Sequence, residues 1–510
     1  MEDKIKIFNS KEAAKYIAHG YKEYKNDEIE IISGPKIYLN NCILNARVES
    51  NAKNQLFSIH DINVDGIEHR KGTFDNPYLC EVHHDIIFNG STITGAIFHY
   101  VHFYGSVSFV NCEINTCSFF KVKADNAVYF NDTVFHGNVS FEQCEFNDSL
   151  SFHNAKFSNF LAFNFNLCKV NGEFNLSHIK TDLTNPIMDY NYQLFINKGI
   201  FSGGLSFKHS HINVDIYISE SRVNGLDLSE IIYQKNLVLS DMILTGINML
   251  SSNDEKKHIK SIEISNSLIS GDFHIQNYFI ESFKMLFCKI ESGNRFHICN
   301  STFNSFENLS STIFGRLDLV NCIVNKTFDM NETSSSGEIL LLNSCQLPKI
   351  NNKHTAMILK KESQKAANIP DYLKYHSIEM NMLYQEKWQD KWNNIPDLIA
   401  LTFSKCSNNF GLSWERGLFF VGSFSILFFH LINYCGTVEP YFAYGSFSGI
   451  EQVMEKYLSL INVFNIINIS NNQDGVVLNS LGKALTYLAK IIISYGFFQT
   501  GMAFRKFNRK

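Results

Sequence analysis

The sequence predicts a mainly β fold, in which a long β-solenoid of stacked short strands is followed by an α-helical neck and two transmembrane helices. Three observations lead to this prediction. Apolar residues, Phe above all, recur about every eleven residues through the first two thirds of the chain, a charged helix-forming segment follows, and two long apolar stretches lie near the end. Because 510 residues are too many for one compact core, several structural units are expected.

We divide the chain where these patterns change. An N-terminal helical cap is expected over residues 1–35, the solenoid over 36–350, the helical neck over 351–406 and a membrane domain over 407–510. The solenoid region holds 23 basic and 32 acidic residues, a net charge of −9, whereas the remainder to the C-terminus holds 16 basic and 11 acidic residues. This mild acidity argues against a solenoid surface that coats nucleic acid.

A six-residue phrase repeats through the solenoid region: an apolar residue, two polar residues, a small residue, any residue and a second apolar residue. Its leading residues are eleven residues apart at Phe130, Phe141, Phe152, Phe163 and Phe174. Earlier in the chain, nearly the same spacing separates Phe88, Phe98, Phe109 and Phe120. Each unit divides into steps of five and six, so two units make a coil of about 22 residues with its apolar positions inside. Interruptions fall near 180–200 and 250–260.

Cysteine often occupies the small position of this phrase, at Cys112, Cys144, Cys168, Cys322 and Cys345. We expect these side chains to fill the narrow interior of the solenoid. His209 with His211, and His83 with His84, have no third or fourth ligand at usable spacing, so no metal site is predicted. No nucleophile elbow, phosphate loop or carboxylate pair is found, so neither a cofactor nor an enzymatic activity is expected.

The neck begins after Ile350, where the repeat ends. Residues 355–392 are charged and helix-forming, and Pro370 falls near the start of a second helix. Helical spacing relates Leu373, Ser377, Met380 and Tyr384. Two antiparallel or kinked helices fit this pattern, and they could either mediate oligomerisation or pack on the end of the solenoid.

The two apolar stretches are the predicted transmembrane helices. Residues 417–434 contain no Asp, Glu, Lys or Arg, and residues 485–504 contain one charge, Lys490. A buried helix of a soluble protein is the alternative for each. Cations flank the pair at Lys391, Lys405, Arg416, Arg505, Lys506, Arg509 and Lys510. This distribution, and the lack of an apolar leader at the N-terminus, predict that both ends and the solenoid are cytoplasmic, with reduced thiols.

The segment between the two spans is predicted to form part of a pore. Residues 450–469 have apolar residues at helical spacing, and a turn-forming SNNQDG sequence follows. Asn462, Asn465 and Asn468 share one helical face and could present amides to ions if the segment re-enters the membrane. An amphipathic helix on the outer surface is the alternative. The segment has no TVGYG-like filter, so potassium selectivity is not indicated.

Lys490 and Ser494 of the second span are further pore-lining candidates. An ionisable residue within a span marks a functional site by default. Lys490 lies only five residues into the span, however, and could instead extend its ammonium to the outer interface. Gly496 and Thr500 form a small-xxx-small pair suited to close contact with another helix.

The repeated phrase resembles that of the pentapeptide-repeat family, on triplets such as Cys144-Glu145-Phe146 and Ala155-Lys156-Phe157. This resemblance implies a right-handed β-helix, although steps of five and six depart from the family's steps of five. The neck sequence LKKESQKAANIPDYLKYHSIEMNMLYQE and the later SNNFGLSWERGLFF and QTGMAFRKF resemble bacterial pentapeptide-repeat membrane proteins. That similarity implies a cytoplasmic β-helix joined to a two-span, channel-like domain in the inner membrane.

The layout is also similar to that of membrane effectors of bacterial anti-phage defence, including the Hailong type. There, a nucleotidyltransferase partner makes DNA oligomers that hold a channel shut. We therefore hypothesise a homo-oligomeric channel or pore-forming effector, most simply a tetramer, gated by an effector that the solenoid senses. The effector could be an oligonucleotide or a protein from the same operon. A membrane-tethered docking scaffold is the alternative, and a DNA-mimic inhibitor of topoisomerase is a second, for which the net charge is weak.

Overall fold

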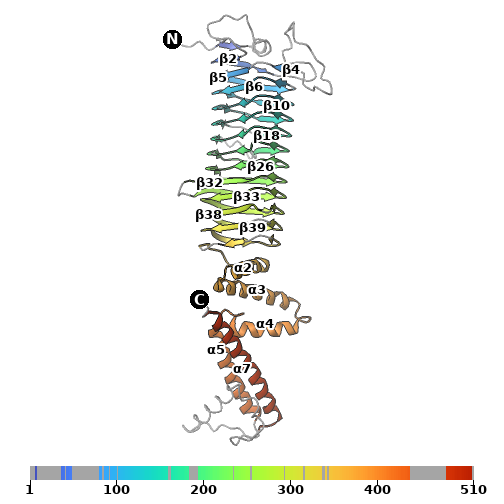
Figure 1. The fold of residues 1–510 in the computed structure, drawn as a ribbon, viewed down its shortest axis with the longest axis vertical. Helices are drawn as coiled ribbons and strands as arrows, with labels where there is room; N and C mark the ends of the chain where they lie inside the picture. Colours follow the sequence, from blue (N-terminus) through green and yellow to red (C-terminus); the bar gives the residue numbers. More distant parts are fainter. Residues whose placement is uncertain are drawn as a thin grey trace. The chain divides into compact units, whose positions relative to one another are not determined.

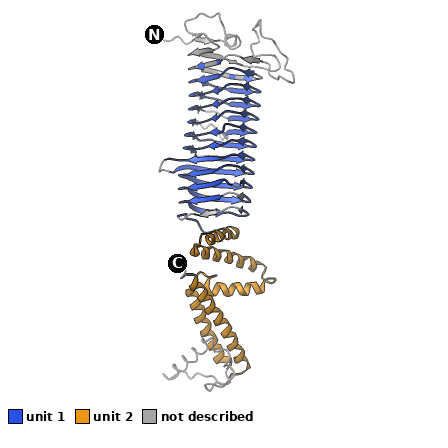
Figure 2. Cartoon of the chain, in the orientation of Figure 1, with its two compact units in different colours: residues 1–349 blue, residues 350–510 orange. Residues whose placement is uncertain are grey.

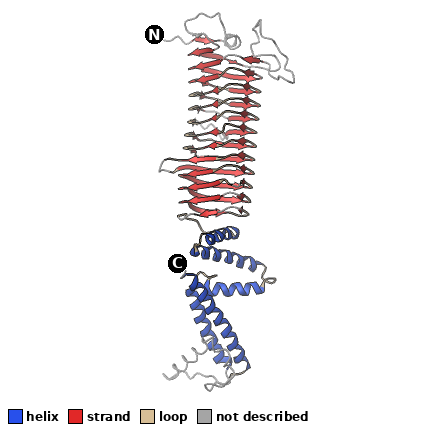
Figure 3. Ribbon diagram, viewed as in Figure 1, coloured by secondary structure: helices blue, strands red, loops and turns tan. Residues whose placement is uncertain are grey.

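The structure is a computed structural model of the whole chain. It describes residues 6–8, 36–40, 42–48, 80–82, 85–90, 92–99, 101–158, 162–182, 193–233, 235–252, 256–291, 293–313, 316–335, 339–341, 344–436 and 478–507. Two compact units divide the chain at residues 349 and 350 (Figure 2). The first is built of strands and the second of helices, and a mainly β solenoid followed by a few helices is the fold that the sequence predicts (Figure 3).

Short parallel strands stack into three sheets in the first unit (Figure 1). A 12-stranded sheet contains β4 (Cys80–Val82), β7 (Val101–Phe103), β11 (Lys123–Ala124), β15 (Glu145–Phe146), β19 (Lys169–Val170), β23 (Ile200–Phe201), β27 (Arg222–Val223), β31 (Ile243–Leu244), β34 (Leu268–Ile269), β37 (Lys289–Ile290), β40 (Thr312–Ile313) and β43 (Ser334–Ser335). A 13-stranded sheet contains β2 (Lys36–Asn40), β5 (Asp85–Asn89), β8 (Val107–Val110), β12 (Val128–Tyr129), β16 (Leu150–Ser151), β20 (Phe174–Asn175), β24 (Leu205–Ser206), β28 (Leu226–Asp227), β32 (Ile247–Leu250), β35 (Phe273–Gln276), β38 (Arg295–Cys299), β41 (Arg316–Val320) and β44 (Ile339–Leu341).

The third sheet has 19 strands and contributes two strands to many of the coils. It contains β1 (Lys6–Phe8), β3 (Cys42–Val48), β6 (Thr92–His99), β9 (Glu113–Ile114), β10 (Cys117–Phe120), β13 (Val134–Phe135), β14 (Val139–Glu142), β17 (Lys156–Ser158), β18 (Ala162–Asn166), β21 (Lys180–Asp182), β22 (Gln193–Asn197), β25 (His211–Ile212), β26 (Asp215–Ser219), β29 (Ile232–Tyr233), β30 (Asn236–Ser240), β33 (Lys257–Ser265), β36 (Tyr278–Leu286), β39 (Thr302–Leu309) and β42 (Ile323–Asp329).

One coil comprises four short strands, and the chain then returns to the same sheet one level on. After β13, β14, β15 and β16, strand β17 pairs with β13 and sets Lys156 against Val134, 22 residues earlier. The predicted coil length is therefore confirmed here. The coil between Lys180 and His211 is longer, at 31 residues, because it contains the interruption that the sequence indicates near 180–200. Residues 183–192 of that interruption lie outside the described part.

Stacked Phe rings run along the interior of the solenoid. The ring centroids of Phe88 and Phe109 are 4.8 Å apart and those of Phe109 and Phe130 are 5.0 Å apart, with planes 1° from parallel in both pairs. This spacing matches the distance between neighbouring strands. The prediction is wrong for Phe120, which is only half-buried, because strand alternation turns Phe119 inward instead.

A residue with a left-handed backbone conformation recurs along the solenoid every ten or eleven residues in many of the described units. In most of the described units one residue has a positive φ, and the residue that follows it is often small, as Asn111 (φ 52°) precedes Cys112. These residues lie at the corners between strands. Asn and Asp fill many of these corners because they tolerate the left-handed conformation better than other side chains.

The N-terminal prediction differs from the structure where the two can be compared. Of residues 1–35, the structure describes Lys6–Phe8, and these form the strand β1, which pairs with β3 instead of forming a helix. The local alternation of Lys and Ile favours a strand over a helical cap. The rest of the predicted cap lies outside the described residues.

The second unit contains α2 (Lys353–Lys365), α3 (Ile369–Gln389), α4 (Ile395–Asn408), α5 (Trp414–Leu431), a π-helical turn η1 (Ile432–Gly436) and α7 (Ser480–Phe507). The two helices predicted for 355–392 correspond to α2 and α3, with Asn352 and Asn368 as N-caps. The helix α4 lies mostly within the predicted helical neck of 351–406, but it was not predicted as a separate helix. Of the helices that the structure describes, one, Trp414–Cys435, is long and apolar enough to cross a membrane. The second span therefore stays a prediction.

Candidate functional site

The helices α5 and α7 lie side by side and antiparallel (Figure 1). Gly417, in the first turn of α5, faces Thr500 near the end of α7, and a Cβ on Gly417 would collide with that side chain. One turn further, a Cβ on Gly496 would lie 2.7 Å from Val421 Cγ2. The predicted contact role of Gly496 and Thr500 is confirmed, because both positions touch α5.

The interface between these two helices holds polar as well as apolar side chains. Val421, Phe428, Ala489 and Ile493 form its buried apolar core. Ser425 is also fully buried, and its hydroxyl donates to the Val421 carbonyl one turn earlier, at 2.6 Å. Thr486 and Thr500 make the same kind of bond, to the carbonyls of Gly482 and Gly496, at 2.8 and 2.7 Å. Hydroxyls satisfied in this way can be buried without a partner on the other helix.

The outward faces of the pair are apolar. The exposed large apolar residues of the two helices are Leu418, Phe419, Ile426, Leu427, Leu431, Leu481, Tyr487, Leu488, Ile491, Phe497, Phe498, Met502 and Phe504. Phe419 is 78% exposed and Ile491 66%, values at which a soluble helix pair would carry polar side chains. Polar groups inside and apolar groups outside suit a hydrocarbon environment.

The helix α4 packs against one end of this pair. The Phe403 ring contacts Phe420 of α5 and Tyr495 of α7, with centroids 6.2 and 6.0 Å apart. The buried Asn408 ends α4, and its Nδ2 donates to Gln499 Oε1 of α7 at 2.8 Å. These contacts join α4 to both helices of the pair.

Two of the five predicted site residues lie one turn apart on α7. Lys490 is only 6% exposed, so its side chain is enclosed within the helical unit, and its carbonyl accepts a hydrogen bond from Ser494 Oγ at 2.6 Å. Ser494 itself is half-buried. Asn462, Asn465 and Asn468, with the rest of 450–469, lie outside the described residues.

Sequence reasoning missed the residues that fix the helices to one another. Gln499 and Asn408 form the polar contact between α7 and the end of α4, but they are 91 residues apart and no local pattern relates them. Ser425 could have been found, because it lies four residues after Val421 and eight after Gly417 on the face that meets α7.

The small positions of the solenoid also do more than the sequence analysis expects. Thr133 Oγ1 donates to the carbonyl of Phe109 at 2.7 Å, and Ser210 Oγ donates to that of Leu176 at 2.8 Å, in each case on the preceding coil. Cys144 Sγ makes the equivalent bond to Phe119. The position therefore favours a small donor (Cys, Ser or Thr) that links coil to coil. The predicted packing role holds for Cys112, Cys144, Cys168 and Cys322, which are buried, whereas Cys345 is half-buried.

Histidine rings on successive coils of the solenoid lie close together. The ring centroids of His153 and His178 are 5.0 Å apart, and those of His178 and His209 are 4.9 Å apart. Partial burial, followed by the two neighbouring rings, lowers the pKa of His178. Within the described ranges no three His, Cys, Asp or Glu residues are placed to hold a metal ion.

No protein-family model matches the chain, and neither the curated proteins nor the solved structures contain a match to it. The interpretation of the helix pair therefore depends on its own geometry. That geometry comprises an apolar exterior, a tightly packed antiparallel contact and one enclosed cation.

Proposed function

We propose that the chain is a membrane protein of the pentapeptide-repeat type. In this proposal the solenoid is right-handed and cytoplasmic, and α5 and α7 cross the inner membrane so that both termini are inside. One observation carries the proposal: the outward faces of α5 and α7 are apolar, while Ser425, Thr486 and Lys490 are buried. In water this arrangement would expose a large apolar surface. In a bilayer the apolar faces would contact lipid, and the polar side chains would stay inside the protein.

We further propose that the membrane domain assembles as a homo-oligomeric channel, with a tetramer as the simplest case. Two helices per chain cannot enclose an aqueous path, so several copies must contribute. Lys490 supports a conducting role, because a cation enclosed among membrane helices is costly and is retained for function. Ser494, on the next turn of the same helix, and Asn462, Asn465 and Asn468 are the other proposed pore-lining residues.

The proposed effector acts on the solenoid and changes the open fraction of the channel. It must bind the open and closed states with different affinities. We propose an oligonucleotide or a protein encoded in the same operon, with depolarisation of the membrane as the output, as in anti-phage defence. The contacts of α4 with α5 and α7 provide a route by which the neck could move the helix pair.

Ion flux through the full-length protein tests the channel. The protein is reconstituted into vesicles of phosphatidylethanolamine and phosphatidylglycerol, and leakage of a trapped ion is compared with that from empty vesicles. Bacteria that express the chain are tested in parallel with a membrane-potential dye, since the cell could supply the effector. Lys490→Met should change the flux, whereas Lys483→Met, at an exposed lysine two turns earlier in α7, should not. No flux in either setting would contradict the channel.

A membrane-tethered docking scaffold is the second candidate, and one feature of the solenoid favours it. Ile200 and Ile243 are exposed and lie in the same sheet two coils apart, with Arg222 aligned between them. Such a column of apolar and cationic side chains on a rigid face could bind a protein. The scaffold predicts that activity survives exchange of both membrane helices for unrelated ones, whereas the channel predicts that it is lost.

A further inference from the structure

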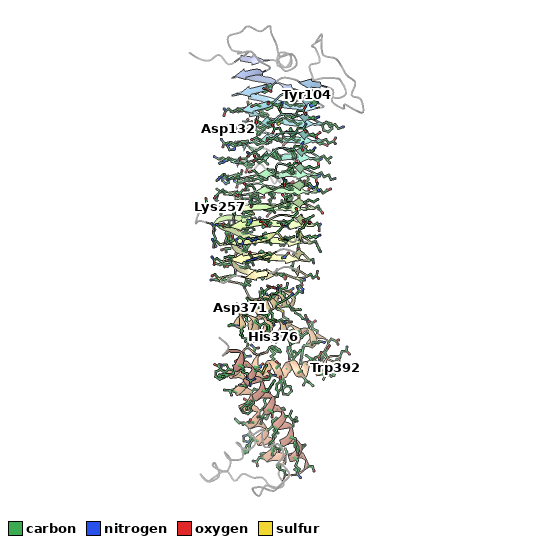
Figure 4. All side chains as sticks on the ribbon, in the orientation of Figure 1. Tyr104, Asp132, Lys257, Asp371, His376 and Trp392 are labelled. Carbon is green, nitrogen blue, oxygen red and sulfur yellow. The ribbon has the colours of Figure 1, made fainter. Side chains whose placement is uncertain are left out.

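The three tryptophans of the chain all lie in the second unit, two at or next to the turn between α3 and α4 and one at the start of the apolar helix α5. They are Trp388, Trp392 and Trp414. Trp388 is 56% exposed and Trp392, at the turn between α3 and α4, is 79% exposed (Figure 4). Such exposure is unusual for the largest apolar side chain. Tryptophan is enriched where a membrane protein meets the headgroup zone, because its ring is amphipathic.

An apolar stripe on α4 continues from these rings to the helix pair. Ile395, Ile399 and Phe403 follow at intervals of four residues and therefore share one face of the helix. Phe403 packs on Phe420 and Tyr495 of the pair, whereas Ile395 and Ile399 are about half exposed. One end of the stripe thus packs against α5 and α7, and the other end is uncovered.

This uncovered end has the shape of a shallow groove. Its volume is about 350 Å³, and it is lined chiefly by Trp388, Trp392, Ile395 and Ile399. A groove of aromatic and branched aliphatic side chains can accept the upper part of an acyl chain.

Lysine ammonium groups lie close to two of the aromatic rings of this region. Lys391 Nζ lies 5.5 Å from the centre of the Trp392 ring, and Lys405 Nζ lies 4.5 Å from that of Tyr384. Arg416 is exposed in the first turn of α5. Lysine and arginine at this level can reach lipid phosphates while their stems lie along apolar groups.

Two carboxylates close to the α3–α4 turn are engaged with their neighbours. Asp397 pairs with Lys387 at 3.1 Å, and Asp390 accepts hydrogen bonds from Asn393 Nδ2 at 3.0 and 3.1 Å. They therefore oppose the approach of an anionic surface less than isolated carboxylates would.

We propose that the surface formed by Trp388, Trp392, Ile395 and Ile399 binds the headgroup zone of a phospholipid bilayer, so that α4 is an interfacial helix. This inference rests on the proposed membrane insertion of α5. It assigns a lipid surface as the partner, because the apolar stripe leads to the helix pair that is proposed to cross the bilayer and because lysines lie beside it. In this position α4 lies along the membrane surface. Its contacts through Phe403 connect α4 to the helix pair.

Fluorescence quenching tests the proposal in the full-length protein. A Trp388→Phe, Trp414→Phe variant keeps Trp392 as its sole tryptophan and is reconstituted into vesicles of phosphatidylethanolamine and phosphatidylglycerol. Its emission is measured with a nitroxide carried on the lipid near the headgroup, and separately with aqueous iodide. The control lacks all three native tryptophans and carries Tyr129→Trp, at an exposed position on the solenoid. Flotation on a density gradient reports membrane insertion of each variant independently.

We expect the lipid nitroxide to remove most of the Trp392 emission, and iodide to leave it largely unchanged. The control should show the reverse. If the variant floats but iodide alone quenches Trp392, the surface faces water, and the inference fails while membrane insertion stands. If it floats and neither quencher acts, protein covers the surface, which also overturns the inference. If the variant and the native chain both fail to float, the proposed membrane function fails, and the inference fails with it.

Discussion

Asn308 places a carboxamide inside the solenoid, among apolar side chains. The residue is fully buried, and among the described residues neither its Nδ2 nor its Oδ1 has a hydrogen-bond partner. Met285 occupies the matching position on the preceding coil. An amide that gives up its hydrogen bonds to water without replacing them destabilises the fold.

Replacing Asn308 with Leu should therefore increase the free energy of unfolding by about 1–2 kcal/mol. The measurement is the Tm of the β-sheet circular dichroism signal of the detergent-solubilised chain. Asn304→Leu is the control, because Asn304 Oδ1 accepts a hydrogen bond from Asn325 at 3.0 Å and should gain nothing from the change. A lower Tm for Asn308→Leu would show that the amide is satisfied in solution.

Glu230 is one member of a sheltered ion pair on the solenoid. Lys257 (labelled in Figure 4) pairs with it across one coil, and Ser252 donates to the same carboxylate. Burial alone would raise the pKa of Glu230, but the hydrogen bonds from Lys257 and Ser252 and the lysine charge outweigh it and lower the pKa to about 2. The folded state thus holds the carboxylate ionised at pH values where the unfolded chain binds a proton.

Because the folded pKa of Glu230 is depressed, its stabilising contribution is complete above pH 4.5 and is lost as the pH falls toward 2. Glu230→Gln should reduce the free energy of unfolding at neutral pH by about 1–3 kcal/mol and flatten its decline over that acidic range. Urea titrations at several pH values measure both effects. Glu220→Gln is the matched control: Glu220 has the same left-handed backbone and a lysine partner but is 53% exposed, so its effect should be within about 0.5 kcal/mol.

At the scale of elements, close packing of α5 on α7 depends on particular glycines. A side chain at Gly496 would press on Val421 and Phe420, whereas a Cβ on Gly422 meets nothing within 4 Å. Gly496→Leu should therefore destabilise the pair by about 1–3 kcal/mol, and Gly422→Leu should be tolerated. The measurement is the temperature at which the solubilised chain leaves its folded peak on size exclusion. An equal fall in this temperature for both variants would contradict the described contact between α5 and α7.

Sequence periodicity identifies the solenoid, because every coil repeats the same inward positions and the signal accumulates. It locates the inward Phe ladder but misplaces Phe120, since one residue of drift moves a side chain to the opposite face of a strand. The left-handed positions at the corners could not be predicted from sequence, because Asn111 and Lys121 share a backbone conformation but have different side chains. Most of the helix α4 lies within the predicted helical neck of 351–406, but it was not separated from the other helices, although Pro396 at its start matches Pro370 at the start of α3.

At the scale of the whole molecule, the proposed orientation predicts which cysteines react from outside the cell. Cys406 and Cys435 are exposed and lie before and after α5. In intact bacteria a membrane-impermeant maleimide should label Cys435 and leave Cys406 unlabelled until the cells are permeabilised. Cys117 should stay unreactive in either case, because burial raises the pKa of its thiol and excludes the reagent.

The Cys406→Ser and Cys435→Ser variants assign the labelled site. Labelling of Cys406 in intact cells would reverse the proposed orientation, and labelling of both would place α5 outside the bilayer.

The order of a solenoid followed by helices follows from the sequence alone, because periodicity and charge both change at the boundary. The candidate site is recovered only in part. Lys490 and Ser494 could be selected from sequence, since a charge in an apolar segment is visible there. The contact of Asn408 with Gln499 could not, because it joins distant segments through tertiary packing.

The in-register return of each coil has a consequence for the length of the protein. Since Val134 and Lys156 occupy equivalent corners, excising residues 134–155 would join Thr133 to Lys156 without altering the path of the chain on either side. Such a deletion would shorten the rod by one step of about 4.8 Å. The distance between the two ends of the solenoid can therefore change only by whole coils. Evolution can in this way lengthen or shorten the solenoid without changing the packing of its interior.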